Sequence, residues 1–293
     1  MTKLEQIQKI SCLLLDEFIK VCRDHNLQWF IDAGSLLGII RHGGFIPWDE
    51  DIDVVMPRKD YNFLYENKDL FFTGRFYLQV GQNCCGDTLT MRLKDSGSTM
   101  IRRKYLSSLF RDRDGCFLVN CGISIDIEPI DHVPEDLVKR NLLISFVDTL
   151  HSDCDIANTC CDNDHQRMMI MSRYDRTSTL YNDVMTYIDG QESPLIACTP
   201  WWIFDNSRGY TVSADCYGGF IEMPFVGCKE SVRVPVGYDE ILRAYYGNYM
   251  VEKKRNTEKI YERVLVDADH SYHDYERFSN EELLKMIENN ETL

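Results

Sequence analysis

The sequence lacks any long apolar run. No stretch of its 293 residues approaches the ~18 consecutive apolar residues that a membrane-spanning helix needs. Near the N-terminus the apolar run covers only Cys12 to Leu15, without the cationic start, long apolar centre and cleavage site of a signal peptide. These absences predict a soluble, cytoplasmic protein with no transmembrane segment.

Two common cysteine arrangements are also missing. Twelve cysteines are present, but none are spaced as C-x-x-C, which argues against a zinc ribbon or a thioredoxin-like site. A chain this long needs no disulfides to hold its core, and without export we expect reduced thiols. One segment offers several metal donors, yet its spacing fits no common zinc module, so we expect an exposed linker without zinc: His151, Cys154, Cys160, Cys161 and His165.

Basic residues are few relative to acidic ones. The chain has 32 Lys and Arg against 47 Asp and Glu, a formal net charge of −15. Such a charge repels a polyphosphate backbone, which argues against nucleic acid as a partner.

Hydrophobic periodicity predicts alternating strands and helices. Apolar residues from Leu4 to Val21 recur at three- and four-residue steps, as on one face of a helix. Polar and apolar residues alternate over Asp51 to Met56 and over Ser124 to Glu128, which predicts two strands. The other expected helices are Leu36 to Arg41, Arg58 to Leu70, Glu135 to Leu150, His165 to Ile188, Tyr238 to Tyr246 and one after a Ser279–Glu282 capping box; the other expected strands are Trp29 to Ile31, Phe76 to Val80, Leu89 to Leu93, Phe220 to Met223 and Ser231 to Val234.

The stretch from Asp32 to Asp53 contains the candidate phosphate-binding and metal-binding residues. Gly34-Ser35 at a strand-to-helix turn would direct backbone N–H groups at a phosphate. Asp51 and Asp53, two residues apart on a strand, would point the same way and share a divalent ion such as Mg²⁺. An isolated Asp-x-Asp is commonly a solvated strand end, but the preceding turn and a third acid on a later strand favour a functional site.

Residues 34–61, GSLLGIIRHGGFIPWDEDIDVVMPRKDY, closely resemble the signature of the LicD family, which includes the fukutin-related proteins. The resemblance continues at residues 91–99, 122–131 and 234–250. It implies an α+β nucleotidyltransferase fold, a mixed sheet flanked by helices with a helical C-terminal extension.

Two long helices are expected after Pro134, where the sequence pattern changes. From this change and from the family resemblance, we predict that the chain has three parts. They are a catalytic core over residues 1–134, an accessory part over 135–265 that completes the substrate cleft, and a tail over 266–293.

The family resemblance also implies residue roles. Asp51, Asp53 and Asp126 would be the catalytic carboxylates that bind Mg²⁺ or Mn²⁺, with Asp126 alternatively taking the proton of the acceptor hydroxyl. Asp49 and Glu50 add acids beside the pair, so the ligand assignment could shift by two positions. The substrate-binding candidates are Gly34 and Ser35 for the phosphate, Arg92 and Lys94 for the donor diphosphate, Arg41 and His42 for further phosphate contact, with His42 also an alternative base, and Trp48, which with Trp201 and Trp202 could enclose a quaternary ammonium group.

The implied reaction is transfer of phosphocholine, or a related phospho-alcohol, from CDP-choline or another CDP-alcohol to a hydroxyl of a cell-surface glycan or glycolipid precursor. Alternatives are transfer of another CDP-linked group such as ribitol phosphate, nucleotidyl transfer onto a small molecule, and a non-enzymatic module that binds glycan or nucleotide.

Overall fold

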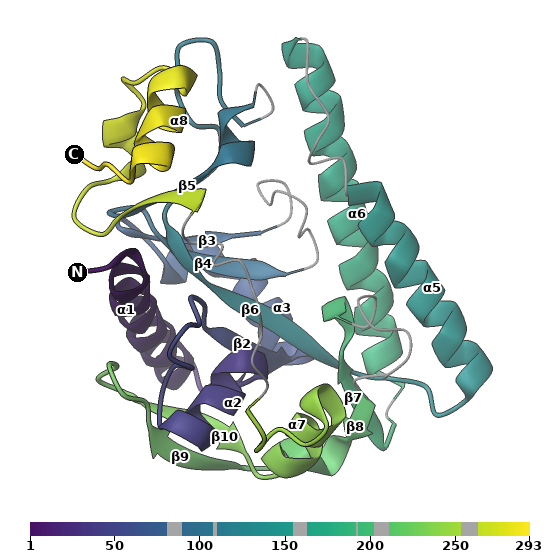
Figure 1. The fold of residues 1–293 in the computed structure, drawn as a ribbon. Coiled ribbons are helices and arrows are strands. Elements are labelled where there is room, and N and C mark those ends of the chain that lie inside the picture. Colours follow the sequence, from purple (N-terminus) through teal and green to yellow (C-terminus); the bar gives the residue numbers. More distant parts are fainter. Residues whose placement is uncertain (81–89, 108–109, 155–162, 192, 202–210, 253–262) are drawn as a thin grey trace.

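The computed structural model describes residues 1–80, 90–107, 110–154, 163–191, 193–201, 211–252 and 263–293. It is a mixed α+β structure in which helices flank a curled sheet, so the predicted fold class is confirmed (Figure 1). No helix among the described residues is long and apolar enough to cross a membrane. The cytoplasmic location and the division into three parts stay predictions.

The main sheet is mixed. Its strands run in the order β1-β2-β6-β4-β3, and β7 and β8 extend it from β6. β2 and β6 are parallel, whereas the other neighbours in this sheet are antiparallel. The strands are β1 (Phe30–Ile31), β2 (Asp53–Pro57), β3 (Phe76–Gln79), β4 (Met91–Asp95), β6 (Ile123–His132), β7 (Leu195–Cys198) and β8 (Thr211–Ser213).

The first helix matches its predicted amphipathic pattern. α1 (Lys3–Asp24) begins at a capping box of Thr2 and Glu5 and packs against β4 and β6. Its buried apolar residues join those of the central strands in the largest core cluster, because side chains three and four apart share one helix face.

Further helices and two small sheets surround the main sheet. α5 (Leu137–Cys154) and α6 (Asp164–Asp189) pack on each other along one side of it, as Figure 1 shows. The remaining elements are α2 (Ala33–His42), α7 (Tyr238–Tyr246), the hairpin of β9 (Phe220–Pro224) and β10 (Ser231–Pro235), the pair of β5 (Thr99–Arg102) and β11 (Val264–Asp267), and α8 (Asn280–Asn289) after the predicted capping box of Ser279 and Glu282.

Several expected boundaries were wrong. β2 begins at Asp53 rather than Asp51, so Asp51 lies in the preceding loop. The expected helix Arg58 to Leu70 is two helices, α3 (Arg58–Glu66) and α4 (Lys68–Phe71), which are separated at Asn67. The strands β5, β7, β8 and β11 were not predicted, because each is short and is paired to a distant segment.

The expectation of reduced thiols throughout was also wrong. Cys12 of α1 and Cys228, in the loop after β9, form a disulfide, with 4.8 Å between their Cα atoms. The two residues are 216 positions apart, so only the fold brings them together. The free cysteines of the described residues include Cys22, Cys121 and Cys198, all buried.

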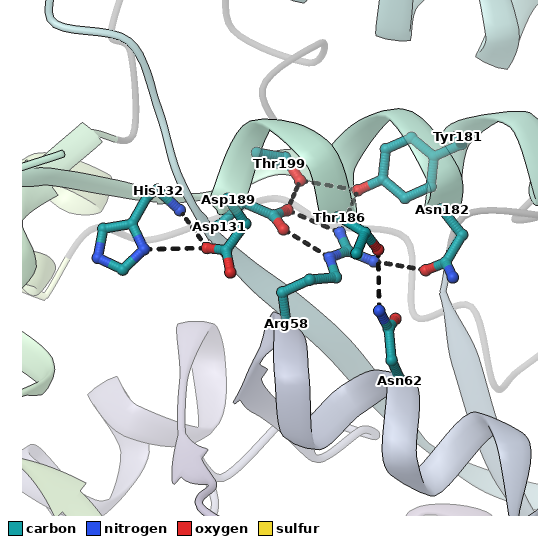
Figure 2. A network of polar contacts seen from close by, with 9 residues as sticks. All are labelled: Arg58, Asn62, Asp131, His132, Tyr181, Asn182, Thr186, Asp189 and Thr199. Atoms are coloured by element: carbon teal, nitrogen blue, oxygen red, sulfur yellow. Dashed lines mark hydrogen bonds and ion pairs between the residues drawn. The ribbon is translucent and has the colours of Figure 1, made fainter. Parts of the chain in front are cut away.

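A buried ion pair joins α3, β6 and α6 (Figure 2). The Arg58 guanidinium donates to both carboxylate oxygens of Asp131, with Nε–Oδ1 at 2.6 Å and Nη2–Oδ2 at 2.7 Å. Both side chains are essentially inaccessible to solvent. Such a pair is stable only when its remaining polar atoms are also bonded, and the surrounding groups that do so are Asn182 and Tyr181 of α6 and Thr199 after β7.

Candidate active site

The predicted strand-turn-helix is present. β1 ends at Ile31 and α2 starts at Ala33, so Gly34 and Ser35 lie in its first turn. The Ser35 hydroxyl accepts a hydrogen bond from the Asp53 N–H, with Oγ–N at 3.0 Å. The Asp32 N–H donates to the Asp53 carbonyl at 3.1 Å. The turn is therefore fastened to the start of β2, which sets the position of the Asp53 carboxylate.

Gly34 leaves room for two carboxylates. A Cβ atom at this position would lie 2.8 Å from Oδ2 of Asp49 and 3.9 Å from Oδ2 of Asp53. The first distance is shorter than real contacts allow, so a larger residue would displace Asp49. Gly34 thus lies directly against the carboxylates of Asp49 and Asp53.

Three carboxylates converge beside this turn. Asp53 of β2 is in register with Asp126 of the parallel strand β6, and Glu128 follows two residues later on the same face of β6. One carboxylate oxygen from each of the three lies within 4.8 Å of the others. We call Asp53, Asp126 and Glu128 the acid cluster. Glu128 was not among the site residues predicted from the sequence. The alternation of polar and apolar residues that predicted the strand of Asp126 also places Glu128 on the same face of that strand.

Asp51 is at the edge of the acid cluster. It lies in the loop before β2 and is exposed to solvent, and its side chain is hydrogen-bonded to that of Asp49. Gln8 of α1 holds this loop by donating to the Asp49 carbonyl at 2.8 Å. Desolvation by the surrounding protein, followed by the charge of Asp126, raises the pKa of Asp51, so Asp51 lies close to the cluster without being one of its three members.

The acids repel one another. Burial, followed by the charges of Asp51, Glu128 and Asp126, raises the pKa of Asp53 well above its ordinary value. Burial and the neighbouring Asp51 raise the pKa of Asp49 to about 8. A divalent cation held by hard oxygen ligands would offset this repulsion, and carboxylates are the donors that Mg²⁺ and Mn²⁺ take. The donor set therefore fits such an ion.

Two basic residues lie on one face of β4. Arg92 is in register with Asp126 and donates to its carboxylate, with Nε–Oδ1 at 2.8 Å. Lys94 is opposite Ser124 and is buried, with Nζ 3.5 Å from the Gly122 carbonyl. The sheet pairing places Arg92 beside Asp126, whereas Lys94 lies two residues further along the same face of β4, away from that pair.

Other predicted residues are not brought to the acid cluster. Arg41 and His42 are at the far end of α2, about 12 Å along the helix axis from Gly34. They contact each other, and Arg41 donates to the Tyr249 carbonyl at 3.2 Å. Trp48 is 40% exposed in the loop before Asp49.

Two sequence interpretations lie largely outside the described residues. These are the box of Trp201 and Trp202 and the segment from His151 to His165.

A family model matches the segment that carries the Gly34-Ser35 turn and Asp53. Residues 26–121 match the family model described as LicD/FKTN/FKRP, nucleotidyltransferase domain. The LicD resemblance predicted from the sequence is thus confirmed over that segment.

Individual relatives are similar to parts of this chain. The chain is 47% identical over 55 residues to the lipopolysaccharide cholinephosphotransferase LicD of Haemophilus influenzae, 18% of this chain and 21% of that protein. It is 27% identical over 143 residues to mannosyltransferase regulator 4 of Saccharomyces cerevisiae, 46% of this chain and 11% of that protein. An uncharacterized protein of Rickettsia typhi is 25% identical over 108 residues, 34% of this chain and 35% of that protein. The matches thus span well under half of each of these relatives.

Proposed function

We propose that this protein is a Mg²⁺- or Mn²⁺-dependent phosphotransferase. It would move phosphocholine, or a related phospho-alcohol, from a CDP-linked donor to a hydroxyl of a cell-surface glycan or glycolipid precursor. The observation that carries the proposal is the convergence of Asp53, Asp126 and Glu128 beside the Gly34-Ser35 turn. The name of the Haemophilus influenzae relative supports choline phosphate and lipopolysaccharide as donor group and acceptor class.

The residues of the site would have different roles in the reaction. Asp53 and Glu128, with Asp126 or Asp51, would hold the metal ion, which when bound neutralises the donor diphosphate. The acceptor oxygen attacks the phosphorus distal to cytidine, the bond from that phosphorus to the bridging oxygen breaks, and CMP leaves.

Charge that develops on the leaving oxygen would be met by Arg92 and Lys94 of β4. The proton of the acceptor hydroxyl passes to a carboxylate. We assign this role to Asp126, because Arg92 already orients its carboxylate through the bond at 2.8 Å.

Two alternative enzymes differ in the bond that breaks or in the donor. Nucleotidyl transfer onto a small molecule places the attack on the α-phosphorus and releases pyrophosphate, whereas transfer of ribitol phosphate changes only the donor alcohol. A non-enzymatic binding module is less well supported, because it gains nothing from keeping mutually repelling carboxylates together at a cost in stability.

A donor screen tests the proposal. The purified chain is incubated with CDP-choline, CDP-ribitol, CTP or ATP, a glycan acceptor and Mg²⁺, and the released nucleotide is identified. We expect CMP from CDP-choline or another CDP-alcohol, and no release in excess EDTA. Pyrophosphate from CTP or ATP would indicate nucleotidyl transfer, and full turnover in EDTA would refute the metal requirement.

A further inference from the structure

A pocket lies at the opposite end of β2 from the acid cluster. β2 runs from Asp53, which belongs to the cluster, to Pro57, and α3 follows directly with Arg58. At roughly 3.3 Å per residue, the two ends of β2 are about 13 Å apart. The pocket has a volume of about 530 Å³ and is bordered by the segment after α1, by α3 and by the end of α6. This volume is typical of a small-molecule site, and the pocket is separate from the proposed transfer site.

Exposed aromatic rings form part of the pocket lining. His25, which follows α1, and Phe63 of α3 both line the pocket, and Phe63 is 42% exposed. His25 stacks on Phe71, with 4.0 Å between the ring centroids, and the ring of Phe63 is 5.9 Å from that of Phe71. Aromatic faces attract cations through the ring quadrupole. This wall therefore suits a group that is cationic and carries apolar surface.

Three carboxylates also line the pocket. They belong to Asp60 and Glu66 of α3 and to Asp189, the last residue of α6. His132 holds the Asp189 side chain in place (Figure 2): its main-chain N–H donates to Oδ1 at 2.8 Å, and its Nδ1 is 3.0 Å from the same oxygen. The position of this negative charge is therefore fixed by the fold.

The balance of charge at the pocket favours a cation. Of the Lys and Arg residues among the described lining, Arg58 is paired with Asp131, and Lys59 alone is set against the three carboxylates. The C-terminal ends of α1 and α6, which carry partial negative charge, border the pocket, whereas α3 contributes one N-terminus of opposite sign. The lining as a whole should attract cations and repel anions.

We propose that this pocket binds a small organic ammonium ion. The alkyl groups of the ion would pack on the rings of His25 and Phe63, while the carboxylates of Glu66 and Asp189 offset its charge. A bare metal ion would gain little from the aromatic wall, so the ligand is an ion with apolar surface. No transfer step takes place here, and the proposal does not rest on the function proposed for the acid cluster.

Choline and a neutral counterpart test the requirement for charge. In 3,3-dimethylbutan-1-ol a carbon atom replaces the nitrogen of choline, so the two probes have nearly the same shape. Each is titrated into the full chain in excess EDTA and without nucleotide, and saturation transfer to its nine equivalent methyl protons is followed by NMR. We expect saturable binding of choline, with the alcohol binding roughly tenfold more weakly. Equal affinities, or no saturable binding of choline, would overturn the proposal.

Two exposed aromatic residues show where choline binds. Phe63→Ala should weaken choline binding about two- to fivefold, the scale of one exposed cation–π contact. The matched control is Trp48→Ala, which removes an aromatic ring of similar exposure, 40%, in the loop before Asp49 and should leave the affinity unchanged. Weaker binding in Trp48→Ala together with unchanged binding in Phe63→Ala would place choline near the acid cluster and refute the pocket assignment.

A pair of charge reversals separates a local contact from the effect of net charge. Glu66→Lys, at an exposed residue of the lining, should weaken choline binding roughly two- to tenfold at low ionic strength. Glu291→Lys makes the same change of net charge at an exposed residue near the C-terminus and should have little effect. Equal weakening in both variants would show that choline responds only to the charge of the whole protein, which would contradict the proposal.

Discussion

The side chain of Ser35 accepts a hydrogen bond from the backbone of Asp53, 18 residues later, with Oγ–N at 3.0 Å. The same hydroxyl is 3.5 Å from the Asp51 carbonyl, to which it donates. Ser35 is 2% exposed, so it secures the loop that delivers the acids. Any contact of Ser35 with phosphate, as predicted from the sequence, would be additional to this role.

Replacing Ser35 should therefore destabilise the protein. Ser35→Ala leaves the buried Asp53 N–H unsatisfied, which costs about 1–3 kcal/mol. Urea unfolding measures the change. The matched control is Ser11→Ala, since the Ser11 hydroxyl is buried with no partner among the described residues, and its removal should be neutral or stabilising. If Ser11→Ala lowered the free energy of unfolding as much as Ser35→Ala, the hydrogen bond from the Asp53 N–H would not explain the effect of Ser35.

Asp53 and Asp126 should differ in their effects on donor binding. Asp53→Asn removes a charge that holds the metal, so both donor affinity and turnover should fall. Asp126→Asn should keep more of the donor affinity and lose about 10²–10⁴ in turnover, the scale for a general base.

Calorimetry with Mg²⁺ present and initial rates measure both quantities. Asp69→Asn, an exposed acid on α4, is the control and should change neither. If Asp126→Asn abolishes metal-dependent donor binding as fully as Asp53→Asn, Asp126 is a metal ligand and the base lies elsewhere.

The buried Arg58–Asp131 pair should be sensitive to loss of one partner (Figure 2). Asp131→Asn leaves the Arg58 charge buried without its counterion, and we expect a loss of about 3–5 kcal/mol in the free energy of unfolding. The control is Asp239→Asn, which weakens the exposed pair with Arg243 and should change the free energy of unfolding little, because water and salt screen an exposed pair. Denaturant unfolding of both variants measures the two changes in the free energy of unfolding. Equal losses of stability would show that the burial of the Arg58–Asp131 pair does not explain its contribution.

Stability should depend on pH through Asp267. Burial alone would raise the pKa of Asp267, but hydrogen bonds from Tyr275, the Asp269 N–H and His270 outweigh it and hold the pKa below its usual value. A carboxyl whose pKa is lowered by folding stabilises the folded state above its unfolded pKa, about 3.9. This contribution is lost as the pH falls through the lower pKa of the folded state.

The stability difference between wild type and Asp267→Asn should therefore shrink as the pH is lowered from about 5 towards the folded-state pKa. Urea midpoints at several pH values measure it. A difference that stays constant across this range would argue against the contribution of Asp267.

Local patterns in the sequence determined the elements that bear the chemistry. The alternation around Asp126 identified its strand, and Gly34-Ser35 identified the strand-to-helix junction at the start of α2, because such signals depend on neighbouring residues. The same reasoning was wrong for Asp51. The alternation of acids with apolar residues predicted a strand from Asp51, but β2 pairs with β6 only from Asp53 and with β1 only from Val54.

Tertiary structure alone decided which side chains meet. β2 and β6 are far apart in the sequence, and their parallel register sets Asp53 beside Asp126 and thereby brings Glu128 into the acid cluster. Cys198 of β7 reaches Glu128 only because β7 pairs with β6. No local periodicity encodes these pairings, since register between distant strands depends on how the whole sheet buries its apolar face.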